Sequence, residues 1–264
     1  MTILQAMDMP GKIKNVIAAF GAKFKENLER DNGLYWQMSS HDGRIKDQSH
    51  WRGTRRWYDE RWHEYGDFHW SLLSRYLLTY AGREYCHSLH MKTALEWGCG
   101  GGANVRPLCH NNALVYGTDV SAPTLDECDY QMRCLGYDNF RKVLIKSETP
   151  EAVFATINSE TIDFILSVAV FQHFPSKAYA EKVLRVFDRL LKDQGFALIQ
   201  VRYYDGSEKL KQKMCNYARN VIYMTSFERE EFSDLLQYTG FTVHSVERDI
   251  DNSRDHHDYY FVQK

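Results

Sequence analysis

Strand-like and helix-like segments alternate from about residue 92 onward, and this alternation constrains the fold more than any other feature of the sequence. The strand-like runs are rich in apolar residues and lie at 93–97, 113–119, 140–145, 161–168 and 195–203. Helix-like stretches separate them, at 103–110, 122–136, 149–157 and 176–193. Strands and helices that alternate at this spacing predict a parallel sheet with helices on both faces.

Two further strand-like runs, 241–249 and 258–264, follow a helix-like stretch at 228–239 and are joined by a polar turn. We expect them to pair as a hairpin, which places one antiparallel strand in the sheet. The predicted fold is therefore an α/β, doubly wound, mostly parallel seven-stranded sheet with an antiparallel terminal strand. The polar turn contains Asp and His residues without fixed ligand spacing, so we predict no metal site there.

The residues before this region form a different kind of segment. An amphipathic pattern at 11–30 and a second helical pattern at 68–82 flank a stretch, 31–66, that has no clear periodicity. We therefore divide the chain into a helical and Trp-rich extension, residues 1–82, and an α/β domain, residues 83–264.

A glycine-rich loop, Glu96-Trp-Gly-Cys-Gly-Gly-Gly102, follows the first predicted strand. Gly98, Gly100 and Gly102 allow a sharp turn and let a ligand approach the backbone at the start of the next helix. Asp119 ends the second predicted strand, where a carboxylate can accept hydrogen bonds from both hydroxyls of a ribose. The two features together predict a site for a nucleoside-bearing cofactor.

Two cofactors fit this loop. The spacing Gly98-x-Gly100-x-x-Ala103 with a later acidic residue also matches the dinucleotide fingerprint, which favours NAD. Three features favour S-adenosylmethionine instead. The Glu96 carboxylate would repel a pyrophosphate, about 90 residues precede the loop, and the terminal hairpin supplies an antiparallel edge strand.

From about residue 92 to its end, the chain resembles the class I S-adenosylmethionine-dependent methyltransferases, which have a Rossmann-like sheet. The resemblance lies in the E-x-G-x-G-x-G loop, the acidic end of strand two, the segment DFILSVAVFQHF and the terminal hairpin. It implies that the loop holds the methionine part of the cofactor, that Asp119 binds the ribose and that Val120 packs on the adenine. The implied cofactor-binding residues are Glu96, Gly98, Cys99, Gly100, Gly102, Asp119, Val120, Ser147, Glu148, Ser167 and Val168.

The methyl acceptor should sit beyond the carboxyl end of strand four, because ligands of open α/β sheets bind there. This strand ends in the segment 167–174, which contains His173. A neutral imidazole can accept a hydroxyl proton, so His173 is the candidate general base. The alternative is a histidine that hydrogen-bonds locally and shapes the loop before the next helix.

The residues that several other methyltransferase reactions require are absent from the segment after strand four. The sequence SVAVF at 167–171 does not match the Asn/Asp-Pro-Pro-aromatic motif of enzymes that methylate adenine or glutamine nitrogens. No acidic cluster stands at this strand end, which disfavours a magnesium-dependent catechol type. No cysteine stands there either, which disfavours covalent attack on a pyrimidine.

Five of the six tryptophans fall between residues 36 and 70, in a segment that also carries many arginines. We hypothesise that this segment is a lid and that residues in it close the site, namely Trp51, Arg52, Trp57, Tyr58 and Trp62. Arg202 and Tyr203, at the end of strand five, are predicted to contact the acceptor together with Trp57, Tyr58 and Trp62. The alternatives are that these aromatics pack the extension onto the sheet, or that they stack RNA bases.

The formal net charge is −2, so the chain has no overall positive field for nucleic acid or an anionic membrane. Neither an apolar leader nor a membrane-spanning run is present, and we expect a soluble, cytoplasmic protein. The predicted activity is transfer of a methyl group from S-adenosylmethionine to an oxygen, or less favourably a nitrogen, of a small polar metabolite such as a sugar. The alternatives are an RNA or protein methyltransferase, a non-catalytic cofactor-binding subunit and an NAD-dependent oxidoreductase.

Overall fold

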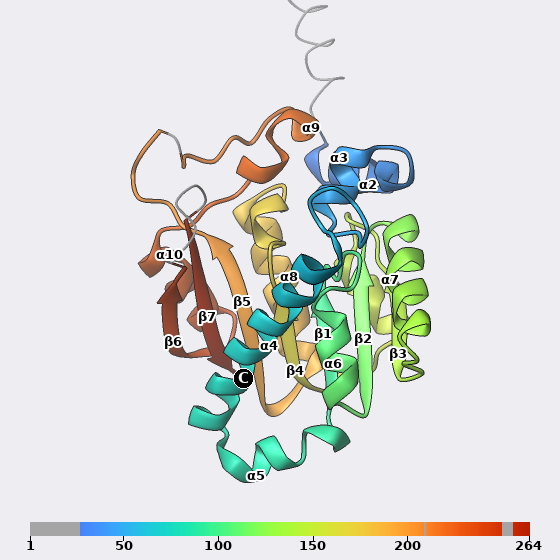
Figure 1. The fold of residues 1–264 in the computed structure, drawn as a ribbon. Coiled ribbons are helices and arrows are strands. Elements are labelled where there is room, and N and C mark those ends of the chain that lie inside the picture. The colour runs from blue at the N-terminus through green and yellow to red at the C-terminus, as the bar shows by residue number, and fades with distance from the viewer. Residues whose placement is uncertain (1–26, 209, 250–255) are drawn as a thin grey trace, which may run out of the picture.

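A computed structural model describes residues 27–208, 210–249 and 256–264. The strands are β1 (Thr93–Trp97), β2 (Leu114–Asp119), β3 (Phe140–Leu144), β4 (Ile162–Ser167), β5 (Leu191–Arg202), β6 (Thr242–Arg248) and β7 (His257–Gln263). They form one sheet in the order β3-β2-β1-β4-β5-β7-β6 (Figure 1). All neighbours run parallel except β7, which is antiparallel to both β5 and β6. The predicted mostly parallel sheet with an antiparallel terminal strand is confirmed.

Helices cover both faces of this sheet, as the alternation predicts. They are α4 (Asp59–Tyr80), α6 (Val105–Asn111), α7 (Ala122–Cys134), α8 (Lys177–Leu190) and α10 (Arg229–Tyr238). Successive strand residues point to opposite faces, so each strand contributes to two cores. Leu95 and Trp97 of β1 pack in one core with residues of α8 and α10, whereas Ala94 packs in the other with residues of α4, α6 and α7.

The helix α8 shows how local sequence sets these elements. The Ser176 hydroxyl accepts a hydrogen bond from the amide of Tyr179 at 3.0 Å, which caps the start of the helix. The apolar stripe that includes Val183, Leu184 and Phe187 is fully buried against the sheet. The predicted helix at 149–157 is shorter than expected and is a 3₁₀ helix, η4 (Pro150–Ala155), a form common in brief connections.

The extension is more helical than its sequence pattern suggests. The predicted helix at 11–30 lies largely outside the described residues. The described part of the extension begins with α2 (Leu28–Gln37), η2 (Met38–Ser40) and α3 (Gly43–Gln48). The helix expected at 68–82 is α4, which begins much earlier, at Asp59. Its first two turns have Trp62 and Gly66 as their buried residues among charged neighbours, so the apolar period is hard to see in the sequence.

Figure 1 shows α2 and α3 above the carboxyl ends of the parallel strands, while α4 runs across one face of the sheet. The short helices α5 (Gly82–His87) and η3 (Leu89–Met91) then lead into β1. The division of the chain between residues 82 and 83 stays a prediction.

The connection after β5 also lies at this edge of the sheet. It contains α9 (Tyr217–Asn220) and η6 (Val221–Tyr223) and packs next to α2 (Figure 1). The short helix η5 (Phe171–His173), which follows β4, lies beside η6. In the described part of the chain, no helix has the length and apolar character needed to cross a membrane.

Candidate functional site

The glycine loop turns sharply between β1 and α6. Gly98 has a φ of +74°, a conformation that glycine adopts without strain, and a Cβ there would lie only 2.4 Å from a methyl carbon of Val170. The amides of Gly98 and Cys99 both donate to the carbonyl of Thr118 at 2.9 Å. The loop is thereby held against the end of β2, next to Asp119.

Asp119 lies where the resemblance places it, at the end of β2 and in the wall of a cavity. One carboxylate oxygen accepts from the amide of Gly100 at 3.2 Å and the other from the amide of Ser121 at 2.9 Å. Desolvation raises the pKa of Asp119 to about 6, although these backbone donors oppose the shift. The carboxylate is therefore oriented by the loop and is partly exposed toward the cavity.

Glu96 is a second carboxylate in the same wall, and only 1% of its surface is exposed. Its Oε1 accepts from the side-chain amide of Asn104 at 2.7 Å. Its Oε2 finds no hydrogen-bond partner among the described residues. Burial raises the pKa of Glu96 well above its usual value, with the nearby Asp119 adding to the effect. A buried acceptor without a donor is costly, so this oxygen is suited to a cationic or hydrogen-bonding ligand.

The extension forms the opposite wall of the cavity. Asn32 and Trp36 come from α2, and Gln48, Ser49 and His50 come from the end of α3 and the turn after it. The Ser49 carbonyl accepts from the amide of Gly101 at 2.6 Å, which joins this turn to the glycine loop. A Cβ at residue 101 would lie 2.5 Å from the carbonyl oxygen of His50, so only glycine permits this close approach.

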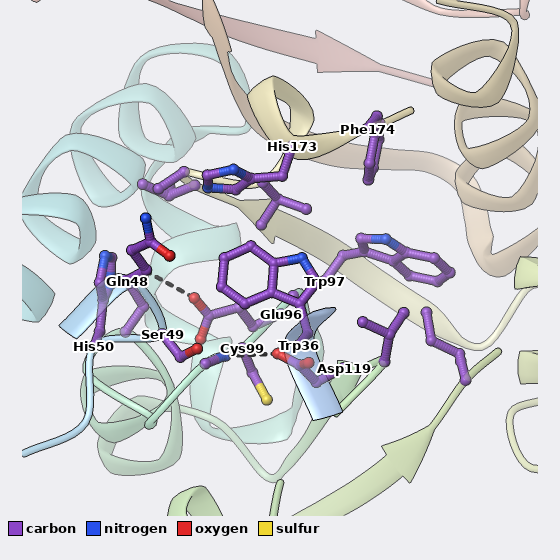
Figure 2. A pocket seen from close by; sticks show the side chains of 18 of the residues that line it. Trp36, Gln48, Ser49, His50, Glu96, Trp97, Cys99, Asp119, His173 and Phe174 are labelled. Atoms are coloured by element: carbon purple, nitrogen blue, oxygen red, sulfur yellow. Dashed lines mark hydrogen bonds between the residues drawn. The ribbon is translucent and has the colours of Figure 1, made fainter. Parts of the chain in front are cut away.

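The cavity between these walls opens to solvent, and the cavity and its mouth together hold about 760 Å³ of empty space. Figure 2 shows the side chains of Glu96, Asp119, Trp36 and His173 around it. Among the described residues that line it, none is Lys or Arg, and the two carboxylates are the charged groups. The remaining lining is aromatic, apolar or neutral polar.

His173 is buried in this wall, with its ring 5.0 Å from the ring of Trp36 in an edge-to-face arrangement. Its Nδ1 lies 2.9 Å from the carbonyl oxygen of Val221, which can only accept, so Nδ1 carries the proton of the neutral ring. Burial lowers the pKa of His173 to about 4. At neutral pH its Nε2 is therefore an unprotonated acceptor.

A tyrosine of the connection after β5 holds this part of the cavity together. The Tyr217 hydroxyl accepts from the indole nitrogen of Trp36 at 3.0 Å and donates to the carbonyl of His173 at 2.8 Å. The extension and the loop after β4 are thus tied through one buried phenol, although Tyr217 itself does not line the cavity.

Most of the predicted cofactor residues meet at this cavity. Its lining includes Glu96, Gly98, Cys99, Gly100, Asp119, Val120 and Val168. The structure does not bring the others to the wall. A Cβ at Gly102 would meet the sulfur of Cys128 on α7, the Ser167 hydroxyl donates to the carbonyl of Trp97, and Ser147 is buried elsewhere. Glu148 is exposed, and Ile145 lies in the cavity wall just ahead of it in the chain.

The predicted acceptor-binding residues lie outside the cavity lining. The indole nitrogens of Trp57 and Trp62 donate to the carbonyls of Asp47 and His50, so both buried rings support the cover from behind. Tyr58 is 52% exposed and is not part of the cavity lining.

The two residues predicted at the end of β5 also have other contacts. The guanidinium of Arg202 is buried over the ring of Tyr223 and donates to the carbonyl of Ile222. Tyr203 packs under the guanidinium of Arg248. Within the predicted lid, Arg52 pairs with Asp59.

Sequence reasoning missed the residues that the extension contributes to the cavity. Trp36 is one of the five clustered tryptophans, and nothing in the sequence distinguishes it from the others. Asn32, Gln48, Ser49 and His50 carry no recognisable motif. The loop has consecutive glycines at 100 and 101, which is more glycine than a sharp turn requires. This excess is the sequence signal that another segment approaches the loop closely.

Comparisons with known proteins agree with this geometry. Residues 95–197 match the model of a methyltransferase domain family. A protein of Encephalitozoon cuniculi, described as a candidate methyltransferase, is 28% identical over 170 residues, which are 63% of this chain and 69% of that protein.

Two solved structures extend the likeness to the whole sheet. Magnesium protoporphyrin IX methyltransferase from Synechocystis PCC 6803 has a TM-score of 0.59 at 15% identity, over 89% of this chain and 97% of that one. The 1,6-didemethyltoxoflavin-N1-methyltransferase of Burkholderia thailandensis has a TM-score of 0.56 at 20% identity, over 76% and 83%. The structural likenesses show the fold, and the family model covers the glycine loop, Asp119 and the loop after β4. The comparisons thus show a methyltransferase domain match over residues 95–197 and a fold shared with S-adenosylmethionine-dependent methyltransferases of known structure.

Proposed function

We propose that the cavity binds S-adenosylmethionine along the glycine loop. The unpartnered Oε2 of Glu96 accepts from the α-ammonium of the methionine part, and the carboxylate of Asp119 accepts from the ribose hydroxyls. Val120 and Ile145 supply apolar contacts for the adenine. The fit rests on Glu96, whose buried carboxylate lacks one partner that a cation would provide.

The acceptor proposed for this cavity is a small, uncharged, polar molecule. The observation that carries this proposal is the absence of Lys and Arg from the described lining, because no cation is available to hold a carboxylate or phosphate. The acceptor would lie between Trp36, His50 and His173, with the neutral amides of Asn32 and Gln48 as hydrogen-bonding groups. The cover formed by α2 and residues 49–51 favours a small molecule over RNA or a protein chain.

The cofactor supplies a methyl group on a sulfonium, which a nucleophile attacks in line. In our proposal His173 Nε2 takes the proton of an acceptor hydroxyl as the oxygen–carbon bond forms, and the Val221 carbonyl stabilises the proton already on Nδ1. The cover of the extension excludes water from the reacting groups.

A nitrogen acceptor in a planar ring is the second candidate. The indole of Trp36 is the kind of surface on which such a ring stacks, and one enzyme of similar fold methylates N1 of 1,6-didemethyltoxoflavin. An amine or imine nitrogen with a free electron pair would need no strong base, so this reaction would depend less on His173.

The test is a screen of acceptors with methyl-labelled S-adenosylmethionine, in pairs that differ by one phosphate or carboxylate. We expect label on uncharged hydroxyl compounds and none on their anionic partners. The His173→Gln variant should lower kcat roughly a hundredfold and leave the affinity for S-adenosylhomocysteine within about twofold. The exposed His110→Gln variant is the matched control. Labelling of anionic acceptors, or unchanged kcat in His173→Gln on a hydroxyl acceptor, would contradict the proposal.

A further inference from the structure

A chain of buried hydrogen bonds begins at the loop after β4 and ends at Glu96. We call the five side chains in it the relay, and all are at least nine-tenths buried: Gln200, Tyr259, His69, Asn104 and Glu96. The amide of Ala169 donates to Gln200 at 2.8 Å, and the Gln200 amide donates to the Tyr259 hydroxyl at 2.8 Å. The relay therefore connects Ala169, whose amide donates to its first member, with Glu96, its last member, and both of these residues line the cavity.

The second half of the relay passes through a histidine of α4. Tyr259 Oη lies 3.0 Å from Nε2 of His69, and Nδ1 of His69 lies 3.1 Å from Oδ1 of Asn104. The Asn104 amide then donates to Glu96 Oε1 at 2.7 Å.

The direction of every bond follows from the two ends. Asn104 donates its NH₂ to the carboxylate, so its oxygen must accept, and His69 Nδ1 must carry the proton. His69 Nε2 then accepts from the Tyr259 hydroxyl, whose oxygen in turn accepts from Gln200. Burial lowers the pKa of His69 to about 4, in keeping with a neutral ring. All the donors point toward Glu96, an arrangement in which each bond strengthens the next.

The strand pattern explains why these side chains meet. Glu96 shares its face of β1 with Ala94, and Tyr259 shares its face of β7 with Phe261, which is the face covered by α4. Gln200 is the cross-strand partner of Tyr259 on β5. The helix α4 comes close enough because residue 66 is glycine, where a Cβ would lie 2.0 Å from the carbonyl oxygen of Ala103.

The first donor of the relay is itself in an unusual conformation. Ala169 has a φ of +58°, which is unfavourable for a residue with a side chain, and its amide is held by Gln200. Ala169 lies in the cavity wall and in the same short loop as His173. The relay thus also holds the loop on which the acceptor side of the cavity is built.

We propose that His69 and Tyr259 are positioning residues, which through Asn104 orient the Glu96 carboxylate toward the α-ammonium of the cofactor. This inference rests on the proposed function, because it takes Glu96 as the group that binds the ammonium. In an apolar site the carboxylate needs such a donor to remain charged.

The test compares two ligands in the Tyr259→Phe variant, which removes the hydroxyl and keeps the ring. S-Adenosylhomocysteine carries the α-amino group, whereas 5′-methylthioadenosine contains the same adenosine and thioether without it. We expect roughly tenfold weaker binding of the first and unchanged binding of the second, with KM for S-adenosylmethionine raised more than kcat is lowered. The Asn104→Ala variant, which breaks the relay at its last bond, should give the same selective loss.

The matched control is Tyr260→Phe. Tyr260 is equally buried on the same strand, but it faces the opposite core and donates to the carbonyl of Arg229. It should lose stability without losing selectivity between the two ligands.

If Tyr259→Phe and Asn104→Ala weaken the binding of both ligands equally, or weaken the binding of neither, the proposed role of the relay is wrong. If the unchanged protein binds neither ligand, the proposed function fails instead. Should Tyr259→Phe not fold, the Asn104→Ala result decides.

Discussion

The two walls of the cavity are built on different principles. The wall from the α/β domain carries both carboxylates, Glu96 and Asp119, on one continuous stretch of β1, the glycine loop and β2. The described residues of the extension wall include no charged side chain and come from α2, α3 and the turn after α3. The first is suited to a cation and to ribose hydroxyls, and the second to an uncharged polar ring. We infer that the domain selects the cofactor and the extension selects the acceptor.

The join between the walls is equally informative. Backbone groups make it at one end, where the Gly101 amide donates to Ser49, and a tyrosine makes it at the other, where Tyr217 contacts Trp36 and His173. Further hydrogen bonds also hold the cover, among them those from Gln37 to the Val120 carbonyl and between Ser39 and Ser121. These contacts lie outside the strands, so the cover can be altered without dismantling the sheet. The predictions below separate the two walls on that basis.

The largest effect is expected in the domain wall. Replacing Asp119 with Ala removes an oriented carboxylate that would accept from two hydroxyls, so affinity for S-adenosylhomocysteine should fall roughly a hundredfold in calorimetric titration. The control is Asp126→Ala, because that exposed carboxylate on α7 pairs with surface Lys142 and does not line the cavity. Unchanged affinity in Asp119→Ala would place the ribose elsewhere and remove the distinction between the walls.

A smaller effect is expected when the extension is pushed away from the domain. In Gly101→Ala the added Cβ would lie 2.5 Å from the His50 carbonyl oxygen and 2.8 Å from Trp51 Cα, so the cover must shift. We expect kcat/KM for the acceptor to fall roughly tenfold and affinity for S-adenosylhomocysteine to fall less. Gly43→Ala is the control, because its Cβ would meet no atom within 4 Å. Equal losses for cofactor and acceptor would mean that the extension serves both alike.

The smallest effect is expected on the pH dependence of the free energy of unfolding. One buried histidine from each region contributes to it. Burial lowers the pKa of His69 in the extension and of His173 in the domain to about 4. As the pH falls, the histidines are therefore protonated in the unfolded chain before they are protonated in the folded one. The folded state keeps its full stability above about pH 6.5 and loses it progressively as the pH falls toward 4. Between pH 7 and 6 each should lower the free energy of unfolding by roughly 0.7 kcal/mol.

This dependence can be measured by urea unfolding at the two pH values. His69→Gln and His173→Gln should each reduce the loss by that amount, and a variant that keeps the full loss would show that its histidine is not buried in the neutral form. The comparison also tests whether the two walls respond to acid independently, since the two losses should add.

Much of the domain side was accessible from sequence. The alternation of segments predicted the order and type of nearly all strands and helices, and the predicted bounds of β1 agree with those observed, 93–97. The glycine loop and Asp119 predicted where the cofactor wall would lie. These features depend on near neighbours in the chain: the period of apolar residues, a helix cap and the position of a loop at the end of a strand.

Which residues of the extension line the cavity was decided by tertiary structure. The tryptophan cluster predicted a cover but pointed to the wrong members for the cavity lining, because Trp57 and Trp62 are buried behind it while Trp36 faces it. The local sequence around an aromatic residue does not predict which other segment its side chain will contact. That choice depends on how α4 crosses the sheet and on the close approaches that Gly66 and Gly101 permit.

The relay shows most clearly that sequence patterns do not predict contacts between distant segments. Its members are separated by up to 190 residues in the chain, as between His69 and Tyr259, and no pattern in the sequence links them. The sequence by itself determined the sheet, the glycine loop and the carboxylate at the end of β2, because short-range periodicity and backbone freedom encode them. Which side chains close the cavity and which support Glu96 was decided only when distant segments packed, because a buried polar group must find its partner in three dimensions.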